Sequence, residues 1–232
     1  MRVAIVGHGK MGGAVAREAR RRGHEVVATI DLAENPSGGG LALEALSGAD
    51  VAFEFTTPSA APGNLTRLAE LGATVVTGTT GWREELPRIA PLVERGGGAL
   101  LHAANFSLGM MAMRHAIRSL GRLLRDRPEF DAALHEAHHN KKLDAPSGTA
   151  LLLQSDLRSE DPTRAWPITS ERVGWVPGTH RLTFDAEFET VTVTHTARDR
   201  AVFAVGAVVA GEWLLGRRGV FTFDDVLTGD ER

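Results

Sequence analysis

Short apolar runs and amphipathic stretches alternate along the first hundred residues. Runs rich in β-branched residues predict strands at residues 2–6, 25–30, 51–56, 74–76 and 99–102. The spacing of apolar positions between them predicts helices at residues 14–22, 59–71 and 83–94, and Gly23 ends the first of these. A loop rich in Gly and Pro is expected at residues 35–40. Strands and helices that alternate in this way are typical of βαβ units and a parallel sheet.

The pattern changes after about Ser107. It predicts helices at residues 108–125 and 150–158, a strand at 130–137, and a polar loop at 159–167. Apolar and polar residues alternate over residues 181–196, as in an antiparallel hairpin with one covered face. The apolar positions of this hairpin are Leu182, Phe184, Ala186, Phe188, Val191 and Val193. A long apolar helix at residues 201–215 follows, so we expect a first domain at 1–107 with 201–232 and a second at 108–200.

A glycine-rich turn follows the first predicted strand. Gly7, Gly9 and Gly12 fit the G-x-G-x-x-G pattern, in which a tight turn presents a helix N-terminus to a pyrophosphate. Asp31 ends the next predicted strand, where a carboxylate accepts hydrogen bonds from an adenosine ribose. A tight turn without a ligand is the alternative. A second small-residue loop, residues 78–81, follows another strand and is either a further cofactor contact or a plain turn. The fold class is therefore α/β, with a Rossmann-type parallel sheet and an α+β second domain that contains a mixed sheet.

Composition excludes several classes of function. Hydrophobic residues make up 43% and charged residues 24%, which is ordinary for a globular protein. The net charge of -3 gives no electrostatic basis for binding nucleic acid or an acidic membrane. The absence of cysteine excludes disulfides, thiolate metal sites and a cysteine nucleophile. The longest apolar run, residues 201–210, is too short for a membrane span, so we expect a cytoplasmic protein.

Histidines and lysines are concentrated between residues 135 and 150. The chain has only three lysines, and two of them, Lys141 and Lys142, lie in this segment with three of the nine histidines. Imidazole and ammonium groups together suit proton donation and anion binding near neutral pH. Residues 147–149 (Ser-Gly-Thr) begin an apolar helix, where free backbone amides provide a site for a carboxylate. A solvated loop with incidental charges is the alternative.

The same segment also matches H-E-x-x-H through His135, Glu136 and His139. In a zinc hydrolase both histidines share one face of a helix, and the glutamate acts on metal-bound water. Here the segment continues a predicted strand and Pro146 follows closely, so extended geometry is favoured. An extended chain places His135 and His139 about 13 Å apart, too far to share a metal ion.

Residues 136–149 (EAHHNKKLDAPSGT) resemble the signature of the dihydrodipicolinate reductase (4-hydroxy-tetrahydrodipicolinate reductase) family of lysine and diaminopimelate biosynthesis. The similarity extends over nearly the whole chain. It includes residues 7–12, 55–56, 78–81, 103–109, 178–180 and 203–206. The glycine loop is shared with many dehydrogenases, whereas the His-His and Asp-Ala-Pro-Ser-Gly-Thr segments are specific to this family.

The resemblance implies a role for individual residues. His138 matches the family's catalytic proton donor and acceptor, and Lys142 matches its second proton donor. His139, Gly148 and Thr149 match positions that hold the carboxylates of the substrate. The family uses NADH or NADPH, and the matching cofactor contacts are Gly7, His8, Gly9, Lys10, Met11, Gly12, Asp31, Gly78, Thr79, Thr80, Ala103, Ala104, Asn105 and Phe106. The family forms a homotetramer, in which the second domain supplies the subunit contacts.

Three features depart from the family pattern. The chain is shorter than many members between Gln154 and Glu171, and Glu54 stands where an aspartate is usual. Leu32 follows Asp31, whereas some members place an arginine there against a 2′-phosphate, and this leaves the cofactor preference open.

We expect an NAD(P)H-dependent reductase that acts on a small cyclic dicarboxylate and carries no metal. The alternatives are another two-domain amino-acid dehydrogenase, such as one acting on aspartate, a non-catalytic dinucleotide sensor, or a zinc hydrolase.

Overall fold

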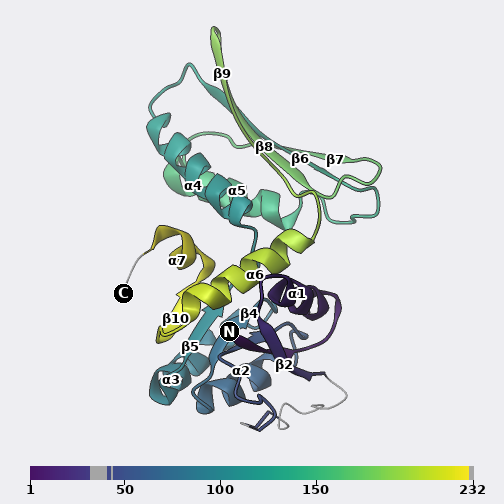
Figure 1. Ribbon diagram of the computed structural model, residues 1–232. Helices are drawn as coiled ribbons and strands as arrows, with labels where there is room; N and C mark the ends of the chain where they lie inside the picture. Colours follow the sequence, from purple (N-terminus) through teal and green to yellow (C-terminus); the bar gives the residue numbers. More distant parts are fainter. Residues whose placement is uncertain (32–40, 43, 230–232) are drawn as a thin grey trace. The chain divides into compact units, whose positions relative to one another are not determined.

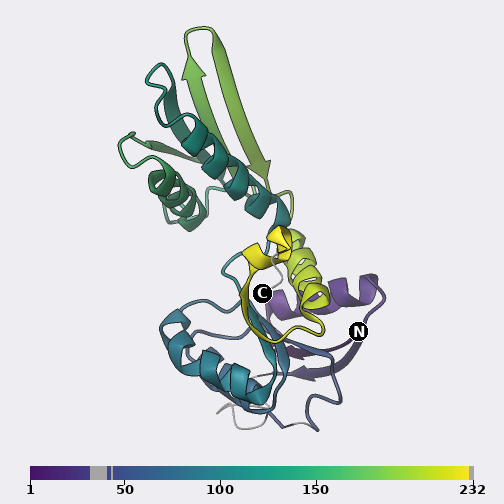
Figure 2. The same ribbon diagram turned by 90° about the vertical axis from the view of Figure 1, so that its left-hand side faces the viewer.

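The computed structural model describes residues 1–31, 41–42 and 44–229, which form two compact units (Figures 1 and 2). Unit 1 comprises Met1–Ser107 with Ala201–Arg232, and unit 2 comprises Leu108–Arg200. The loop predicted at residues 35–40 lies outside the described residues. Among the helices that the structure describes, none combines the length and apolarity needed to cross a membrane.

Unit 1 contains a six-stranded sheet in which every neighbouring pair of strands is parallel. The strand order is β10-β5-β4-β3-β1-β2. The strands are β1 (Arg2–Val6), β2 (Glu25–Ile30), β3 (Val51–Glu54), β4 (Thr74–Thr77), β5 (Ala99–His102) and β10 (Gly219–Thr222). Because all six strands run the same way, their carboxyl ends share one edge, where open α/β sheets bind ligands.

Helices cover both faces of this sheet. The helices of unit 1 are α1 (Lys10–Arg21), α2 (Ala61–Glu70), α3 (Leu86–Gly96), α6 (Ala201–Leu214) and α7 (Phe223–Thr228), with a short 3₁₀ helix at Arg83–Glu85. Alternate strand residues such as Ala52 and Val75 pack with Leu65 of α2 and Ile89 of α3 in one apolar cluster. Phe53 faces the other way, and its ring lies against α6. Helix α6 also packs along α1 (Figure 1).

Unit 2 contains a four-stranded mixed sheet with the order β7-β6-β8-β9. Its strands are β6 (Asp131–His138), β7 (Ile168–Arg172), β8 (Thr179–Ala186) and β9 (Glu189–Thr196). Strands β6 and β7 are parallel, whereas β6 with β8 and β8 with β9 are antiparallel. Helices α4 (Leu108–Leu123) and α5 (Gly148–Glu160) pack on one face of the sheet (Figure 2).

The expected class of fold is confirmed, and several local predictions are corrected. Phe188 does not belong to the covered face of the hairpin: it lies in the turn between β8 and β9 and is 90% exposed. The first helix begins at Lys10, because helical geometry starts directly at the glycine turn. Strands β7 and β10 and helix α7 were not predicted.

Candidate active site

The glycine turn of unit 1 packs so tightly that two of its positions exclude any side chain. A Cβ on Gly7 would lie 2.4 Å from the carbonyl oxygen of Phe55, and the φ of Gly7 is +91°. A Cβ on Gly12 would lie 1.9 Å from the carbonyl oxygen of Gly7. Gly9, which caps α1, has open space instead, so the first amides of the helix remain accessible to a ligand. This arrangement fits the pyrophosphate of a dinucleotide.

Asp31 directly follows β2 and lies beside the glycine turn. The backbone amide of His8 donates to its Oδ1 at 3.4 Å. The carboxylate is therefore held at the carboxyl edge of the sheet, where an adenosine ribose is expected to bind. Leu32, the next residue, lies outside the described residues.

Parts of the other two predicted cofactor segments, residues 79–80 and 103–104, line one pocket of about 200 Å³. Thr79 and Thr80 follow β4, and Ala103 and Ala104 follow β5, so neighbouring strands bring them together. Asn105 and Phe106 extend the second segment: the Asn105 side chain accepts from the Ser107 amide at 2.8 Å, and Phe106 is buried.

Sequence reasoning missed three other residues of this pocket, Trp82, Arg83 and His102. Burial is the largest cause that lowers the pKa of His102, and the positive charge of Arg83 adds to it. Their positions gave a signal, because Trp82 and Arg83 follow the second glycine loop directly and His102 ends a predicted strand at the same edge.

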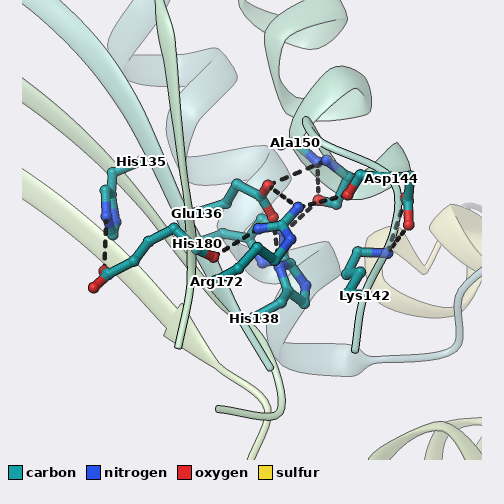
Figure 3. Close-up of polar contacts among 10 residues, drawn as sticks. His135, Glu136, His138, Lys142, Asp144, Ala150, Arg172 and His180 are labelled. Atoms are coloured by element: carbon teal, nitrogen blue, oxygen red, sulfur yellow. Dashed lines mark hydrogen bonds and ion pairs between the residues drawn. The ribbon is translucent and has the colours of Figure 1, made fainter. Parts of the chain in front are cut away.

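Unit 2 carries a buried polar cluster at the end of β6. Residues two apart on a strand point to the same face, so Glu136 and His138 lie side by side. Register then adds partners from both neighbouring strands: Arg172 of β7 pairs with His138, and His180 of β8 pairs with Glu136. Figure 3 shows these four side chains converging on one another.

The carboxylate of Glu136 is the centre of this cluster, with 0% of its side chain exposed. Its Oε2 lies 2.5 Å from Nδ1 of His138. Nη2 of Arg172 and the amide of Ser147 donate to its Oε1 at 2.7 and 3.3 Å. Burial alone would raise the pKa of Glu136, but hydrogen bonds from Arg172, Ser170 and Ser147 outweigh it and lower the pKa to about 2. The group is therefore ionised near neutral pH.

Two imidazoles adjoin this carboxylate, and burial lowers the pKa of both. Burial lowers the pKa of His138, and although the charge of Glu136 opposes it, Lys142 and Arg172 reinforce it. Burial also lowers the pKa of His180 to about 4, with a contribution from His138. The Ser147 hydroxyl accepts from the amide of Ala150 at 3.2 Å, and it also shares a hydrogen bond of 3.2 Å with Nε2 of His180.

The remaining predicted residues lie in the loop after β6 and at the start of α5. Lys142 donates to both carboxylate oxygens of Asp144, at 2.7 and 2.9 Å. A turn joins the Lys142 amide to the carbonyl of His139 at 3.1 Å. Gly148 and Thr149 are the first residues of α5, and Ser147 caps that helix. The structure thus places all five residues predicted for catalysis and substrate binding in unit 2, with His138, His139 and Lys142 at the end of β6 or in the loop after it and Gly148 and Thr149 at the start of α5.

The zinc-hydrolase geometry is wrong for this chain. His135 and Glu136 lie on a strand and point to opposite faces, and Nε2 of His135 is 3.5 Å from Glu171 instead. Glu136, His138 and His180 do place one potential ligand atom each within 4.8 Å of one another. However, the guanidinium of Arg172 already pairs with Glu136, so a divalent cation there would meet a positive charge. We interpret this cluster as a hydrogen-bonded and ion-paired network.

Comparison with known proteins identifies the family. The model for the N-terminal part of dihydrodipicolinate reductase matches residues 1–106, and the model for its C-terminal part matches residues 109–227. The 4-hydroxy-tetrahydrodipicolinate reductase of Christiangramia forsetii is 33% identical over 240 residues, which cover 98% of each chain. That of Methanospirillum hungatei is 36% identical over 194 residues, covering 77% of this chain and 75% of the relative.

A solved structure has the same fold. Dipicolinate-bound dihydrodipicolinate reductase from Paenisporosarcina sp. TG-14 superposes with a TM-score of 0.80 and 24% identity, over 96% of this chain and 97% of that one. The matched family models cover nearly the whole chain and both of its units. The chain is therefore an oxidoreductase that uses a nicotinamide cofactor, and it belongs to the dihydrodipicolinate reductase family.

Proposed function

We propose that this chain reduces 4-hydroxy-tetrahydrodipicolinate, via dihydrodipicolinate, to tetrahydrodipicolinate in lysine and diaminopimelate biosynthesis. One observation carries the proposal: unit 2 gathers an imidazole, an ammonium group and a helix N-terminus at one place, which suits a small dicarboxylate. The curated relatives bear the name of this activity. An aspartate-type dehydrogenase or a dinucleotide sensor has no need of this second group of residues.

The bound nicotinamide supplies the hydride. Hydride addition to the unsaturated ring leaves negative charge at the ring nitrogen, and a positioned acid neutralises it. Lys142 and His138 are the two acids that we assign to this step. Asp144 holds the Lys142 ammonium in place through two short contacts, and Glu136 holds His138.

The substrate's carboxylates bind at His139, Gly148 and Thr149 in this proposal. Gly148 has open space where a side chain would stand, and the first-turn amides of α5 carry the positive end of the helix dipole. His139 directly follows β6, so its ring belongs to the same end of the sheet as His138.

Unit 1 binds the cofactor in the same proposal, through Gly7–Gly12, Asp31, Gly78–Thr80 and Ala103–Phe106. We propose that NADH is used at least as well as NADPH. The support is the contact between the His8 amide and Asp31, which holds the carboxylate in place. There it can accept a hydrogen bond from a ribose hydroxyl, and its charge repels a 2′-phosphate. Lys10, the first residue of α1, provides the charge through which NADPH is still accepted.

A homotetramer built on unit 2 completes the proposal. Helices α4 and α5 cover one face of the mixed sheet, while Thr190, Thr192 and Thr194 of β9 are exposed. Sedimentation equilibrium of the purified chain tests this: a mass of four chains supports it, and a monomer contradicts it.

The activity is tested by following NADH absorbance with the product of the preceding synthase reaction as substrate. We expect consumption of NADH that persists with a chelator and is inhibited competitively by pyridine-2,6-dicarboxylate, a planar mimic of the substrate. Absence of turnover, with the dicarboxylate failing to bind, would overturn the proposal. Activity abolished by the chelator alone would instead favour metal chemistry.

A further inference from the structure

We propose that Glu136 is a positioning residue for His138, which fixes the ring so that Nδ1 carries a proton and Nε2 faces the substrate. This inference rests on the proposed role of His138 in the reaction. Glu136 touches neither substrate nor cofactor in the proposal, and it acts only through the imidazole.

Each oxygen of the buried Glu136 carboxylate has its own partner. Oε1 accepts from Arg172 of β7 (Figure 3) and from the amide of Ser147, the N-cap of α5, so the carboxylate is anchored from two elements. Oε2 is left for Nδ1 of His138, 2.5 Å away. Among the described residues neither of these two buried atoms has a hydrogen-bond partner of regular geometry, so their approach is a close charged contact between the carboxylate and the ring. The imidazole is therefore held on one side by a carboxylate that cannot turn away.

This contact selects one tautomer of the ring. An ionised carboxylate only accepts protons, so the neutral His138 ring keeps its proton on Nδ1. Nε2 then alternates between a bare acceptor and, in the imidazolium, a donor. Gly178 leaves space beside that atom, because a Cβ at this position would lie 3.2 Å from Nε2. Nε2 is thus the nitrogen available for proton transfer.

The charges around His138 make the carboxylate necessary. Arg172 of β7 and Lys142 of the loop after β6 are cations, and His180 of β8 is a further titratable neighbour. Burial and both cations disfavour the imidazolium, whereas Glu136 is the anion that favours it. Glu136 therefore raises the proton affinity of a ring whose burial and cationic neighbours lower it.

The test compares Glu136→Gln with a matched control, Glu171→Gln, in the full-length protein. Glu171 also lies near a histidine, with Oε2 3.5 Å from Nε2 of His135, but its side chain is 53% exposed. In Glu136→Gln the amide oxygen is expected to face Arg172, which turns the NH2 group toward His138. The ring must then accept at Nδ1 and carry its neutral proton on Nε2.

We expect kcat of Glu136→Gln to fall about tenfold or more, with KM changed less than about threefold. The limb of the kcat/KM profile on which activity falls with rising pH should move to lower pH, because the imidazolium has lost its anion. Glu136→Asp keeps the negative charge but has a shorter side chain, so its kcat/KM profile should lie between those of the wild-type protein and Glu136→Gln. Glu171→Gln should keep the wild-type profile. A purely structural role would lower activity equally at every pH.

Nitrogen-15 spectra of labelled histidine provide a second measurement on the wild-type protein, which does not depend on a variant folding. A neutral His138 protonated on Nδ1 supports the proposal, and one protonated on Nε2 overturns it. His138→Gln distinguishes a failure of the role proposed for His138 from a failure of the role proposed for Glu136. If it stays active, the role assigned to His138 fails; if it is inactive while Glu136→Gln keeps the wild-type profile, the positioning role fails.

Discussion

Replacing Lys142 with alanine tests the proton donor without disturbing the fold. The Lys142 side chain, which is 23% exposed, donates to both carboxylate oxygens of Asp144, whose side chain is 58% exposed. Ion pairs at the protein surface contribute little to stability because water screens them. The side chain is removed from a loop, so no core cavity is created. We therefore expect a melting temperature close to that of the wild-type protein.

The effect on turnover should be much larger. Loss of a positioned proton donor typically lowers the rate by about 10²- to 10⁴-fold, which corresponds to about 3 to 5 kcal/mol of activation free energy. Steady-state kcat, measured by NADH absorbance alongside the melting temperature, gives both quantities. Lys142→Arg is a second variant, because a guanidinium keeps the charge beside Asp144 but does not release a proton.

Lys141→Ala is the matched control for this prediction. Its ammonium group lies 4.9 Å from the ring centroid of Trp175, an 82% exposed side chain, and makes no contact with Asp144. We expect it to retain kcat. A Lys142→Ala enzyme within threefold of wild-type kcat would refute the reasoning, as would an equal loss in Lys141→Ala.

Three further predictions concern the cofactor, the space beside His138, and pH. The kcat/KM for NADH should be at least equal to that for NADPH; a preference for NADPH above tenfold, or about 1.4 kcal/mol, would mean that Asp31 does not meet the ribose. Gly178→Ala should lower kcat, because its φ of +148° is strained for alanine and the new Cβ would lie 3.2 Å from Nε2 of His138; an unchanged kcat would contradict the assignment of Nε2. The pKa of His180 is lowered from 6.5 to about 4, so the folded state binds fewer protons than the unfolded state in this window. Stability from urea titrations should therefore decline by up to about 3 kcal/mol as pH falls from 6.5 to 4, and His180→Asn should flatten this decline.

The parallel sheet of unit 1 was predictable because each of its first five strands is a local apolar run. Strand β10 was missed since its partner β5 lies more than a hundred residues earlier in the chain. Strand β7 (Ile168–Arg172) was missed because it alternates only weakly in burial and lies at the edge of its sheet. In neither case does the sequence of the strand itself indicate which strand it pairs with.

The residues of the candidate site likewise fall into those that are neighbours in sequence and those that only the sheet brings together. His138, Lys142 and the start of α5 are neighbours in sequence, so they could be predicted together from one segment. Arg172 and His180 reach His138 and Glu136 only through the register of three strands, which no local pattern encodes. Glu136 was noticed as part of H-E-x-x-H, but the strand gives it His138 as a partner, two residues away, and not a metal.

The discontinuity of unit 1 has a consequence for how the chain is made on the ribosome. Unit 2 is one uninterrupted segment, whereas α6 and β10 of unit 1 are synthesised after it. Until they emerge, β5 offers an unpaired edge where β10 belongs, and Phe53 lacks the helix that packs against its ring. The nascent first half therefore exposes both an apolar face and a strand edge while unit 2 is being translated. Slow translation over residues 108–200 prolongs this exposure, so chaperone binding should be strongest on nascent chains of that length.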